Sequence, residues 1–338
     1  MIFLSFLLAC TEETASIDDV TDANGEDVPP QLELVPGENS FVLQQEISGI
    51  PTERKFHIKV PRDFTAESSY SVMFSFHGRD RNCVNPDGSG EGDPAKDMME
   101  FVREFSSLDD VVIVFPKGHH CMWNLSDYSS IPGVEEPTAT IEEELAFIDL
   151  ILDKLATVDG VNVNDLYAAG NSNGSSLCHY IASQREHSFK GFMTMVSGLQ
   201  PDQLPFATQP AVSVLQMNNR RDPYLPYEGS YGTLSAEESI VAWAEHNGCD
   251  MTPQVSGVDD LLFYRYPNCR EGVSVELVSA MPIPWPNECE QAWDIAQQSG
   301  EQFYPPNGAD CGFGHVIPAN FFPNGDLWQY TWDFLSAE

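Results

Sequence analysis

The feature that most constrains the fold of this chain is the pentapeptide GNSNG at residues 170–174. A short apolar run, 166–169, precedes it, and a segment with helical character, 175–182, follows it. A serine between two glycines at a strand-to-helix turn is typical of a strained turn that exposes a nucleophile, because flanking side chains would collide with the strand and the helix. The helix N-terminus at that turn favours developing negative charge. We therefore predict that Ser172 is a nucleophile.

A serine nucleophile in this setting needs an acidic residue later in the chain. Residues 211–217 have an apolar strand pattern, and Asp222-Pro223 follows in the loop past the end of that strand. Open α/β sheets place their chemistry at the carboxyl ends of their strands. Asp-Pro is equally an ordinary start of a turn, so this local pattern alone leaves both interpretations of Asp222 open.

The order serine, acid, histidine restricts the choice of a general base. Of the eight histidines, only His246 and His315 follow Asp222. His246 lies in a helical stretch, 235–247, whereas His315 lies in the glycine-rich segment 311–318 before the last expected helix. Glycines allow a loop to approach a site closely, and an imidazole with an ordinary pKa near ~6.5 suits a general base. We predict His315 as the base; the alternative is a histidine on a surface loop.

Strand and helix patterns alternate along most of the chain, which predicts an α/β fold with a mostly parallel central sheet and helices on both faces. The expected strands are near 41–47, 54–61, 71–77, 110–116, 165–170, 190–197, 211–217, 260–266 and 273–279. The expected helices are near 94–106, 139–157, 173–185, 235–247 and 325–336.

Several segments match, in the same order, the motifs of one known family. They are residues 72–78 (VMFSFHG), 112–118 with Trp123-Asn124, 144–149, the pentapeptide, 222–229 (DPYLPYEG), Trp243 with 247–249 (NGC), and 314–318 (GHVIP). On these motifs the chain resembles the esterase/poly(3-hydroxybutyrate) depolymerase family, which includes the feruloyl and acetylxylan esterases of carbohydrate esterase family 1. The likeness covers most of residues 50–338 and implies the α/β-hydrolase fold.

The resemblance also assigns residues. Ser172, Asp222 and His315 match the catalytic triad of the family, and the backbone N–H groups of Asn173 and Arg79 are expected to form the oxyanion hole. Substrate-binding candidates are Trp123, Tyr224 and Trp285.

The expected activity is hydrolysis of carboxylic esters through an acyl-enzyme. The candidate substrates are feruloyl or acetyl esters of polysaccharides, or a polyhydroxyalkanoate-type polyester, and the sequence does not separate them. Two alternatives stay open: a serine peptidase of the same fold, and a catalytically silent surface protein that keeps the fold as a binding module.

The chain departs from the family pattern at three places. Asn218-Asn219 stand where the family has His-Gly four residues before its acid, and Ile317 replaces the tryptophan of the last motif. Trp285-Pro286 occurs earlier, but Ile283 holds the place that a histidine would need. Residues 283–311 are therefore interpreted as an insertion before the histidine loop, at the rim of the cleft.

The charge of the chain excludes some partners. Only 16 Lys and Arg oppose 52 Asp and Glu, which gives a formal net charge of −36. Such a surface repels nucleic acid and anionic membranes. We expect an ester substrate, no nucleic-acid partner and a monomer; the sequence leaves open whether the acidity reflects a saline habitat.

The N-terminus has the pattern of an export signal. Residues 1–9 are almost wholly apolar, and Leu7-Leu8-Ala9-Cys10 resembles a bacterial lipobox, although no Lys or Arg precedes Arg54. Residues 11–40 are acidic and poor in aromatic residues, as in a disordered spacer. The expected organisation is a signal segment at 1–10, a spacer at 11–40 and a catalytic domain at 41–338. Export to the outside of the cell, with membrane attachment only through a lipid on Cys10, follows from this pattern.

The cysteine content supports export. With Cys10 set aside, we expect Cys178 to be a buried free thiol and the other six cysteines to form disulfides. The expected pairs are Cys83–Cys121, Cys249–Cys269, which resembles a pair of the family, and Cys289–Cys311. Spacing does not prove this connectivity.

No cofactor or metal is expected. Residues 87–93 alternate oxygen ligands as a calcium loop does, but its twelfth position is Met98 rather than glutamate. The adjacent His119 and His120 tend to point apart, so they are interpreted as residues of the site rim or of the surface.

Overall fold

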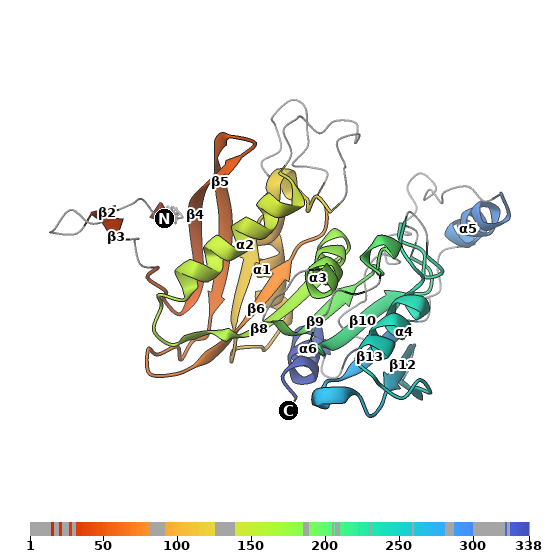
Figure 1. The fold of residues 1–338 in the computed structure, drawn as a ribbon. Coiled ribbons are helices and arrows are strands. Elements are labelled where there is room, and N and C mark those ends of the chain that lie inside the picture. Colours follow the sequence, from red (N-terminus) through yellow and green to blue (C-terminus); the bar gives the residue numbers. More distant parts are fainter. Residues whose placement is uncertain are drawn as a thin grey trace, which may run out of the picture.

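The computed structural model describes the greater part of the chain (Figure 1). The described residues are 15–16, 20–21, 27–28, 32–80, 92–125, 139–184, 189–204, 206, 210–222, 224–229, 232–258, 260–280, 287–299, 322 and 325–337. Within them lies one eleven-stranded sheet with helices on both of its faces.

The sheet is mixed, with a parallel centre. Its order is β1-β4-β5-β7-β6-β8-β9-β10-β13-β12-β11. The run from β7 to β13 is parallel, whereas β4, β5 and β7 pair antiparallel, as do β13, β12 and β11. The strands are β1 Ala15–Ser16, β4 Gly37–Ile47, β5 Ile50–Val60, β6 Tyr70–Phe76, β7 Val112–Pro116, β8 Val161–Asn171, β9 Phe189–Met195, β10 Ser213–Asn219, β11 Gln254–Val258, β12 Leu261–Tyr266 and β13 Val275–Ala280. A separate pair consists of β2 Val20–Thr21 and β3 Asp27–Val28.

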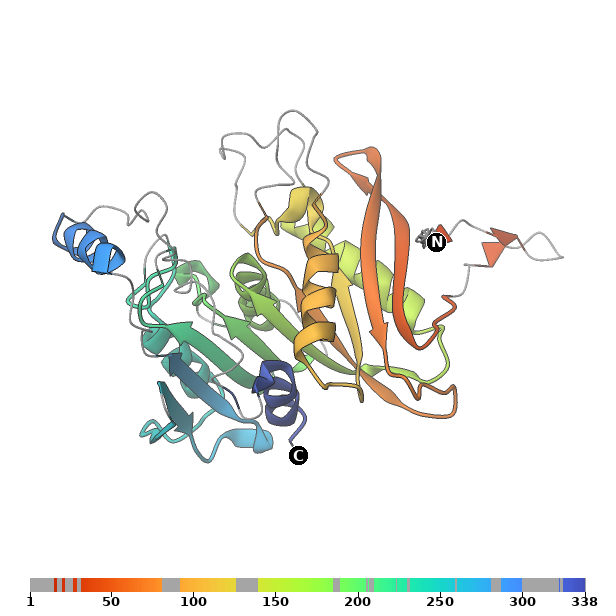
Figure 2. The ribbon, with the colours of Figure 1, turned by 180° about the vertical axis from the view of Figure 1, so that it is seen from behind.

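The helices divide between the two faces. They are α1 Pro94–Phe105, α2 Ile141–Leu155, α3 Asn173–Gln184, α4 Ala236–His246, α5 Asn287–Ser299 and α6 Leu327–Leu335, with short 3₁₀ turns at His119–Cys121, Pro201–Gln203 and Arg270–Gly272. Figure 1 shows α2, α3 and α4 in front of the sheet, and Figure 2 shows α1 and α6 on the opposite face.

Two apolar cores follow from this arrangement, because successive side chains of a strand point to opposite faces. Phe74 of β6 packs in the core beneath α2, α3 and α4, whereas its neighbour Met73 packs in the core beneath α1 and α6. The strands that are buried on both faces are continuous apolar runs, as expected for the centre of a parallel sheet. The predicted α/β fold is confirmed.

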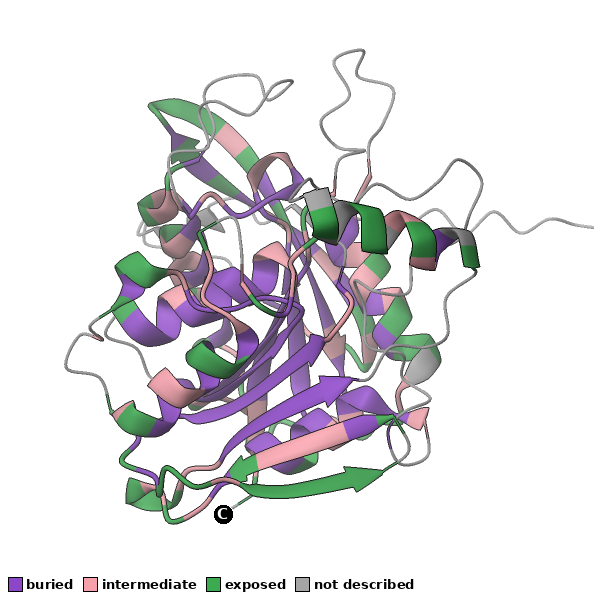
Figure 3. Ribbon diagram, turned by 90° about the vertical axis from the view of Figure 1, so that its right-hand side faces the viewer, coloured by how far each residue is buried: buried purple, intermediate pink, exposed green. Residues whose placement is uncertain are grey.

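Each predicted strand and helix has a counterpart whose ends lie within four residues of the prediction. The sequence patterns missed the short strands β1, β2 and β3 as well as β11 and α5. All five residues of β11 are exposed, at the edge of the sheet (Figure 3), so this strand carries no apolar alternation that a sequence pattern could detect. Helix α5 lies inside the predicted insertion 283–311, where no helix was expected.

The predicted C-terminal boundary of the disordered spacer, residue 40, is wrong. Strand β4 begins at Gly37, and Leu32 is buried, so the folded domain starts before residue 41. Strand β1 pairs with β4, inside the segment that was expected to be disordered. The predicted signal segment, with Cys10, lies outside the described residues.

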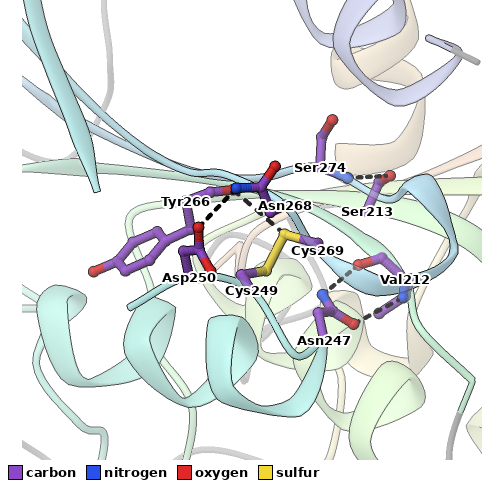
Figure 4. The surroundings of a disulfide bond; sticks show 9 residues. All are labelled: Val212, Ser213, Asn247, Cys249, Asp250, Tyr266, Asn268, Cys269 and Ser274. Carbon is purple, nitrogen blue, oxygen red and sulfur yellow. Dashed lines mark hydrogen bonds between the residues drawn. A yellow bond between two sulfur atoms is a disulfide. The ribbon is translucent and has the colours of Figure 1, made fainter. Parts of the chain in front are cut away.

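The predicted cysteine roles agree with the described part of the structure. Cys249, just after α4, forms a disulfide with Cys269, which follows β12 (Figure 4). Beside it, the Asn247 side chain bonds both backbone groups of Val212, at 3.1 and 2.8 Å, and so joins the end of α4 to the start of β10. Cys178 is free and buried, as predicted.

Two further cysteines, Cys121 and Cys289, are disulfide-bonded. Their predicted partners, Cys83 and Cys311, lie outside the described residues. In the part of the chain that the structure describes, no helix has the length and apolar character needed to cross a bilayer.

Candidate active site

The predicted nucleophile sits at the turn between β8 and α3. Ser172 has a φ of 51°, the left-handed region that residues with a Cβ rarely adopt. Its backbone N–H donates to the carbonyl of Met195 at 2.9 Å, and its carbonyl accepts from the N–H of Ser176 at 3.2 Å. The neighbouring strand and the first turn of α3 therefore hold the strained conformation in place.

The two glycines of the pentapeptide are required by close backbone contacts. A Cβ on Gly170 would overlap the carbonyl of Gly174, and a Cβ on Gly174 would overlap the carbonyl of Phe76 at the end of β6. The collision predicted from the sequence is thus confirmed. The strand order and this strand–turn–helix element make the fold that of the α/β-hydrolases.

The loop after β6 lies directly against the nucleophile. A Cβ added to Gly78 would stand 3.3 Å from the Cβ of Ser172. Arg79 follows in the same loop, and Asn173 is the first residue of α3. The backbone segments of both predicted oxyanion donors therefore flank Ser172, from the β6 loop on one side and from the helix N-terminus on the other.

Asp222, the predicted acid, lies past the carboxyl end of β10. Its side chain is 1% exposed, and its Oδ1 accepts the N–H groups of Tyr224 and Leu225 at 2.8 and 2.9 Å. These two bonds fix the orientation of the carboxylate. Asp222 therefore starts a turn, as one interpretation holds, and its carboxylate is buried there; its role as the acid stays a prediction.

Of the unusual Asn218-Asn219 pair, Asn218 joins the end of β10 to Ser197 and Asn219 bonds within the turn that carries Asp222. The side chain of Asn218 accepts from Gln216 at 2.9 Å and donates to the carbonyl of Ser197 at 3.3 Å. The side chain of Asn219 accepts the N–H of Arg221 at 2.9 Å. This departure from the family pattern supplies backbone support for the loop that carries Asp222.

The predicted base and one substrate candidate, His315 and Trp285, lie outside the described residues. Within the predicted insertion 283–311 the structure describes α5, whose Glu290 forms an ion pair with Arg221, the residue before Asp222. Figure 1 shows α5 to one side of the sheet, beyond β10 and β13.

The two described aromatic candidates for substrate binding differ in exposure. Tyr224 is 43% exposed beside Asp222, as a residue of a cleft rim must be. Trp123 is 0% exposed: its ring packs edge-on against Phe76, and its indole N–H donates to the carbonyl of His77 at 2.9 Å. The prediction that Trp123 contacts substrate is therefore wrong, because the protein interior surrounds its ring.

A cavity of about 480 Å³ lies beside the nucleophile turn, between α1 and α6. Gly78, Arg79 and Asn171 line the end next to Ser172. The apolar part of the wall comes from Met98, Phe101, Met193, Met195, Leu327 and Trp328. The sequence patterns did not identify this wall, because its residues come from three elements, α1, β9 and α6, that only the fold brings together.

Three polar atoms at this cavity are buried without a hydrogen-bond partner in the described part of the structure. They are Ser75 Oγ, Asn171 Oδ1 and Trp328 Nε1.

A second Ser–His–Asp cluster lies on other elements. Ser40 Oγ is 2.7 Å from His57 Nδ1, and Asp93 is 3.2 Å from His57 Nε2. Ser40 and His57 face each other across β4 and β5, and Asp93 caps α1 by accepting the N–H of Lys96. Burial raises the pKa of the Asp93 carboxyl, but the bonds from His57 and Lys96 lower it to about 2. This cluster ties α1 to the sheet, which accounts for its geometry without a catalytic role.

The comparisons with known proteins agree with this geometry. No family model matches the chain. A protein of Aspergillus niger named probable feruloyl esterase C is 24% identical over 200 residues, which are 58% of this chain and 63% of that protein. One of the same name from Aspergillus oryzae is 23% identical over 252 residues, covering 73% of this chain and 78% of that protein. The chain thus spans less than two thirds of the length of the first of these relatives.

Among solved structures, the chain has a weak likeness to an acetyl xylan esterase from Aspergillus awamori, with a TM-score of 0.42 and 10% identity over 75% of this chain and 91% of that one. A thermostable esterase has a TM-score of 0.43 and 13% identity over 85% of this chain and 65% of that one. The sequence relatives confirm the resemblance to feruloyl esterases that the motifs indicate.

Proposed function

We propose that this protein is an exported serine carboxylic ester hydrolase that removes acyl groups from polysaccharide esters. The observation that supports this most strongly is the nucleophile turn, in which Ser172 has a φ of 51° and stands next to Gly78 at the N-terminus of α3. Strained backbone positions cluster at active sites, and here the strained residue carries a hydroxyl at a helix N-terminus. The names of the sequence relatives supply the substrate class.

The reaction proceeds in two acyl transfers. His315 accepts the proton of the Ser172 hydroxyl as its oxygen attacks the ester carbonyl, and the C–O bond to the alcohol then breaks as His315 returns that proton to the leaving oxygen. Water, activated by the same base, cleaves the acyl-enzyme. Asp222 holds the imidazole in the required tautomer, and the N–H groups of Asn173 and Arg79 stabilise the oxyanion.

The cavity beside the turn suits the acyl group. Its volume of about 480 Å³ lies within the range of small-molecule pockets, which hold a group that ends inside them. A polymer chain continues in both directions and needs an open surface, so the sugar side of the ester stays outside. This arrangement favours a polysaccharide ester with a bulky acyl group over a polyester chain.

The test of the proposed function is direct. The purified full chain is expected to hydrolyse p-nitrophenyl butyrate and methyl ferulate, and diisopropyl fluorophosphate is expected to stop the reaction by phosphorylating the Ser172 hydroxyl with release of fluoride. Peptide mass spectrometry locates the added group. Absence of hydrolysis and of labelling in the folded protein would instead support a silent binding module.

A larger residue in the cavity is expected to change acyl selectivity. Met98→Trp fills space between α1 and the nucleophile turn, so kcat/KM for methyl ferulate should fall at least about tenfold relative to p-nitrophenyl acetate. Met251→Trp is the matched control, because Met251 is 45% exposed and is not among the cavity residues. An unchanged selectivity ratio in Met98→Trp would show that the acyl group binds elsewhere.

A further inference from the structure

One loop contacts both sides of the oxyanion hole. This loop, residues 117–124, follows β7, and we name it the clamp loop. On one side, the backbone N–H of Trp123 donates to Asn173 Oδ1 at 2.6 Å, and Asn173 Nδ2 donates to the carbonyl of Trp123 at 3.0 Å. The side chain of Asn173 is thus paired twice with one residue, which fixes the start of α3 against the clamp loop.

On the other side, the clamp loop holds the segment that carries Arg79. The indole N–H of Trp123 donates to the carbonyl of His77 at 2.9 Å. The backbone N–H of Gly118 donates to His77 Nε2 at 2.9 Å, and His77 Nδ1 donates to the carbonyl of Gly78 at 2.6 Å. That carbonyl belongs to the same planar peptide unit as the Arg79 N–H, so its bond to His77 sets the direction in which the Arg79 N–H points.

His77 must be neutral to make these two hydrogen bonds. Burial lowers the pKa of His77 to about 4, so the ring is neutral at the pH where an imidazole base works. A neutral ring accepts at one nitrogen and donates at the other, as the two bonds require.

The clamp loop is itself rigidly held. A Cβ on Gly118 would overlap the carbonyl of Met122, and His120 and Cys121 have φ values of 51° and 56°. At its base, the N–H of His119 donates to Glu144 Oε1 at 3.0 Å, and Arg54 Nη2 donates to the carbonyl of Lys117 at 3.2 Å. Arg54 and Glu144 form a buried ion pair at 2.6 Å.

We infer that Trp123 is a positioning residue, which couples the two backbone donors of the oxyanion hole through its indole N–H and its own peptide groups. Trp123 contacts no substrate and acts only by orienting Asn173 and the His77–Arg79 segment. This inference rests on the proposed function, because it assigns a role in the same reaction.

The test is Trp123→Phe, which keeps an aromatic ring but removes the indole N–H. Loss of one oxyanion donor costs about a hundred- to a thousand-fold in kcat, so its misorientation is expected to lower kcat by at least about tenfold. KM should stay within about twofold, and a boronic acid that mimics the tetrahedral intermediate should bind more weakly by the same factor as kcat falls.

Trp243→Phe is the matched control. Trp243 is also 0% exposed, and its indole N–H also donates to a buried partner, His179 Nδ1 at 3.1 Å, but it lies on α4 away from the clamp loop. The inference is supported if kcat falls in Trp123→Phe alone. It is overturned if both variants keep kcat, or if both lose it equally, because a general packing defect then explains the result.

Asn173→Ala provides a second test if Trp123→Phe does not fold. This change keeps the backbone N–H of residue 173 but removes both bonds to Trp123, and it should show the same fall in kcat at an unchanged KM. Wild-type kcat in a folded Asn173→Ala protein would overturn the coupling. A wild-type chain without hydrolysis would overturn the proposed function and the inference together, whereas an active wild type with active variants would overturn the inference alone.

Discussion

Ser172→Ala is expected to lower kcat for p-nitrophenyl butyrate by about 10⁵- to 10⁶-fold while leaving the fold intact. Removing the nucleophile of a serine triad has an effect of this order, and the small residual rate comes from the oxyanion hole and substrate binding. Alanine has a smaller side chain than serine, so the turn keeps its backbone bonds to Met195 and Ser176. The measurement is steady-state hydrolysis, with circular dichroism to confirm folding.

Ser183→Ala is the control for this change. Ser183 lies on the same helix and is 0% exposed, and among the described residues its hydroxyl donates to the carbonyl of Tyr180 at 3.4 Å, within that helix. We expect wild-type kcat for this variant. A Ser172→Ala protein that hydrolyses the ester at more than about a hundredth of the wild-type rate would show that another group is the nucleophile.

Glu144→Gln is expected to lower the free energy of unfolding by about 3–5 kcal/mol, the cost of removing one partner of a buried ion pair. Glu144 is 0% exposed. Its carboxylate forms an ion pair with the Arg54 guanidinium at 2.6 Å and accepts a hydrogen bond from the His119 N–H at 3.0 Å. The amide keeps the shape of the side chain but leaves the charge of Arg54 buried without a counter-charge, even though that guanidinium lies 4.1 Å from the centre of the Phe147 ring. Urea unfolding measures the difference.

Glu38→Gln gives the matched comparison. Glu38 pairs with Arg103 at 2.9 Å, but the two side chains are 33% and 55% exposed. Water and salt screen such a pair, so its loss should cost less than about 1 kcal/mol. Equal costs for the two variants would show that burial adds nothing to the Arg54–Glu144 pair.

The nucleophile turn was predictable from the sequence because its physics is local. A Cβ on Gly170 would overlap Gly174 of the same pentapeptide, and a Cβ on Gly174 would overlap the end of β6; the need for glycine at both positions is visible in five consecutive residues. The central strands were predictable for a similar reason, since continuous apolar runs suit strands that are buried on both faces. Asp222 was ambiguous in the sequence, because a turn and a catalytic acid use the same dipeptide.

The role of Trp123 was not predictable from the sequence. A tryptophan in a loop near the site fits a substrate wall and a buried brace equally well, and only the packing of Phe76 and the carbonyl of His77 decide between them. Similarly, β11 has five exposed residues and is a strand only because β12 lies beside it.

The sequence by itself determined the nucleophile turn, the alternation of strands and helices, and the order of the predicted triad, because each depends on residues close together in the chain or on their order along it. The tertiary structure alone decided which side chains line the cavity. It also decided how the clamp loop bonds to both Asn173 and His77, and how the buried Arg54–Glu144 ion pair supports that loop. Those features depend on contacts between strands and helices that are tens of residues apart, which local propensity does not encode.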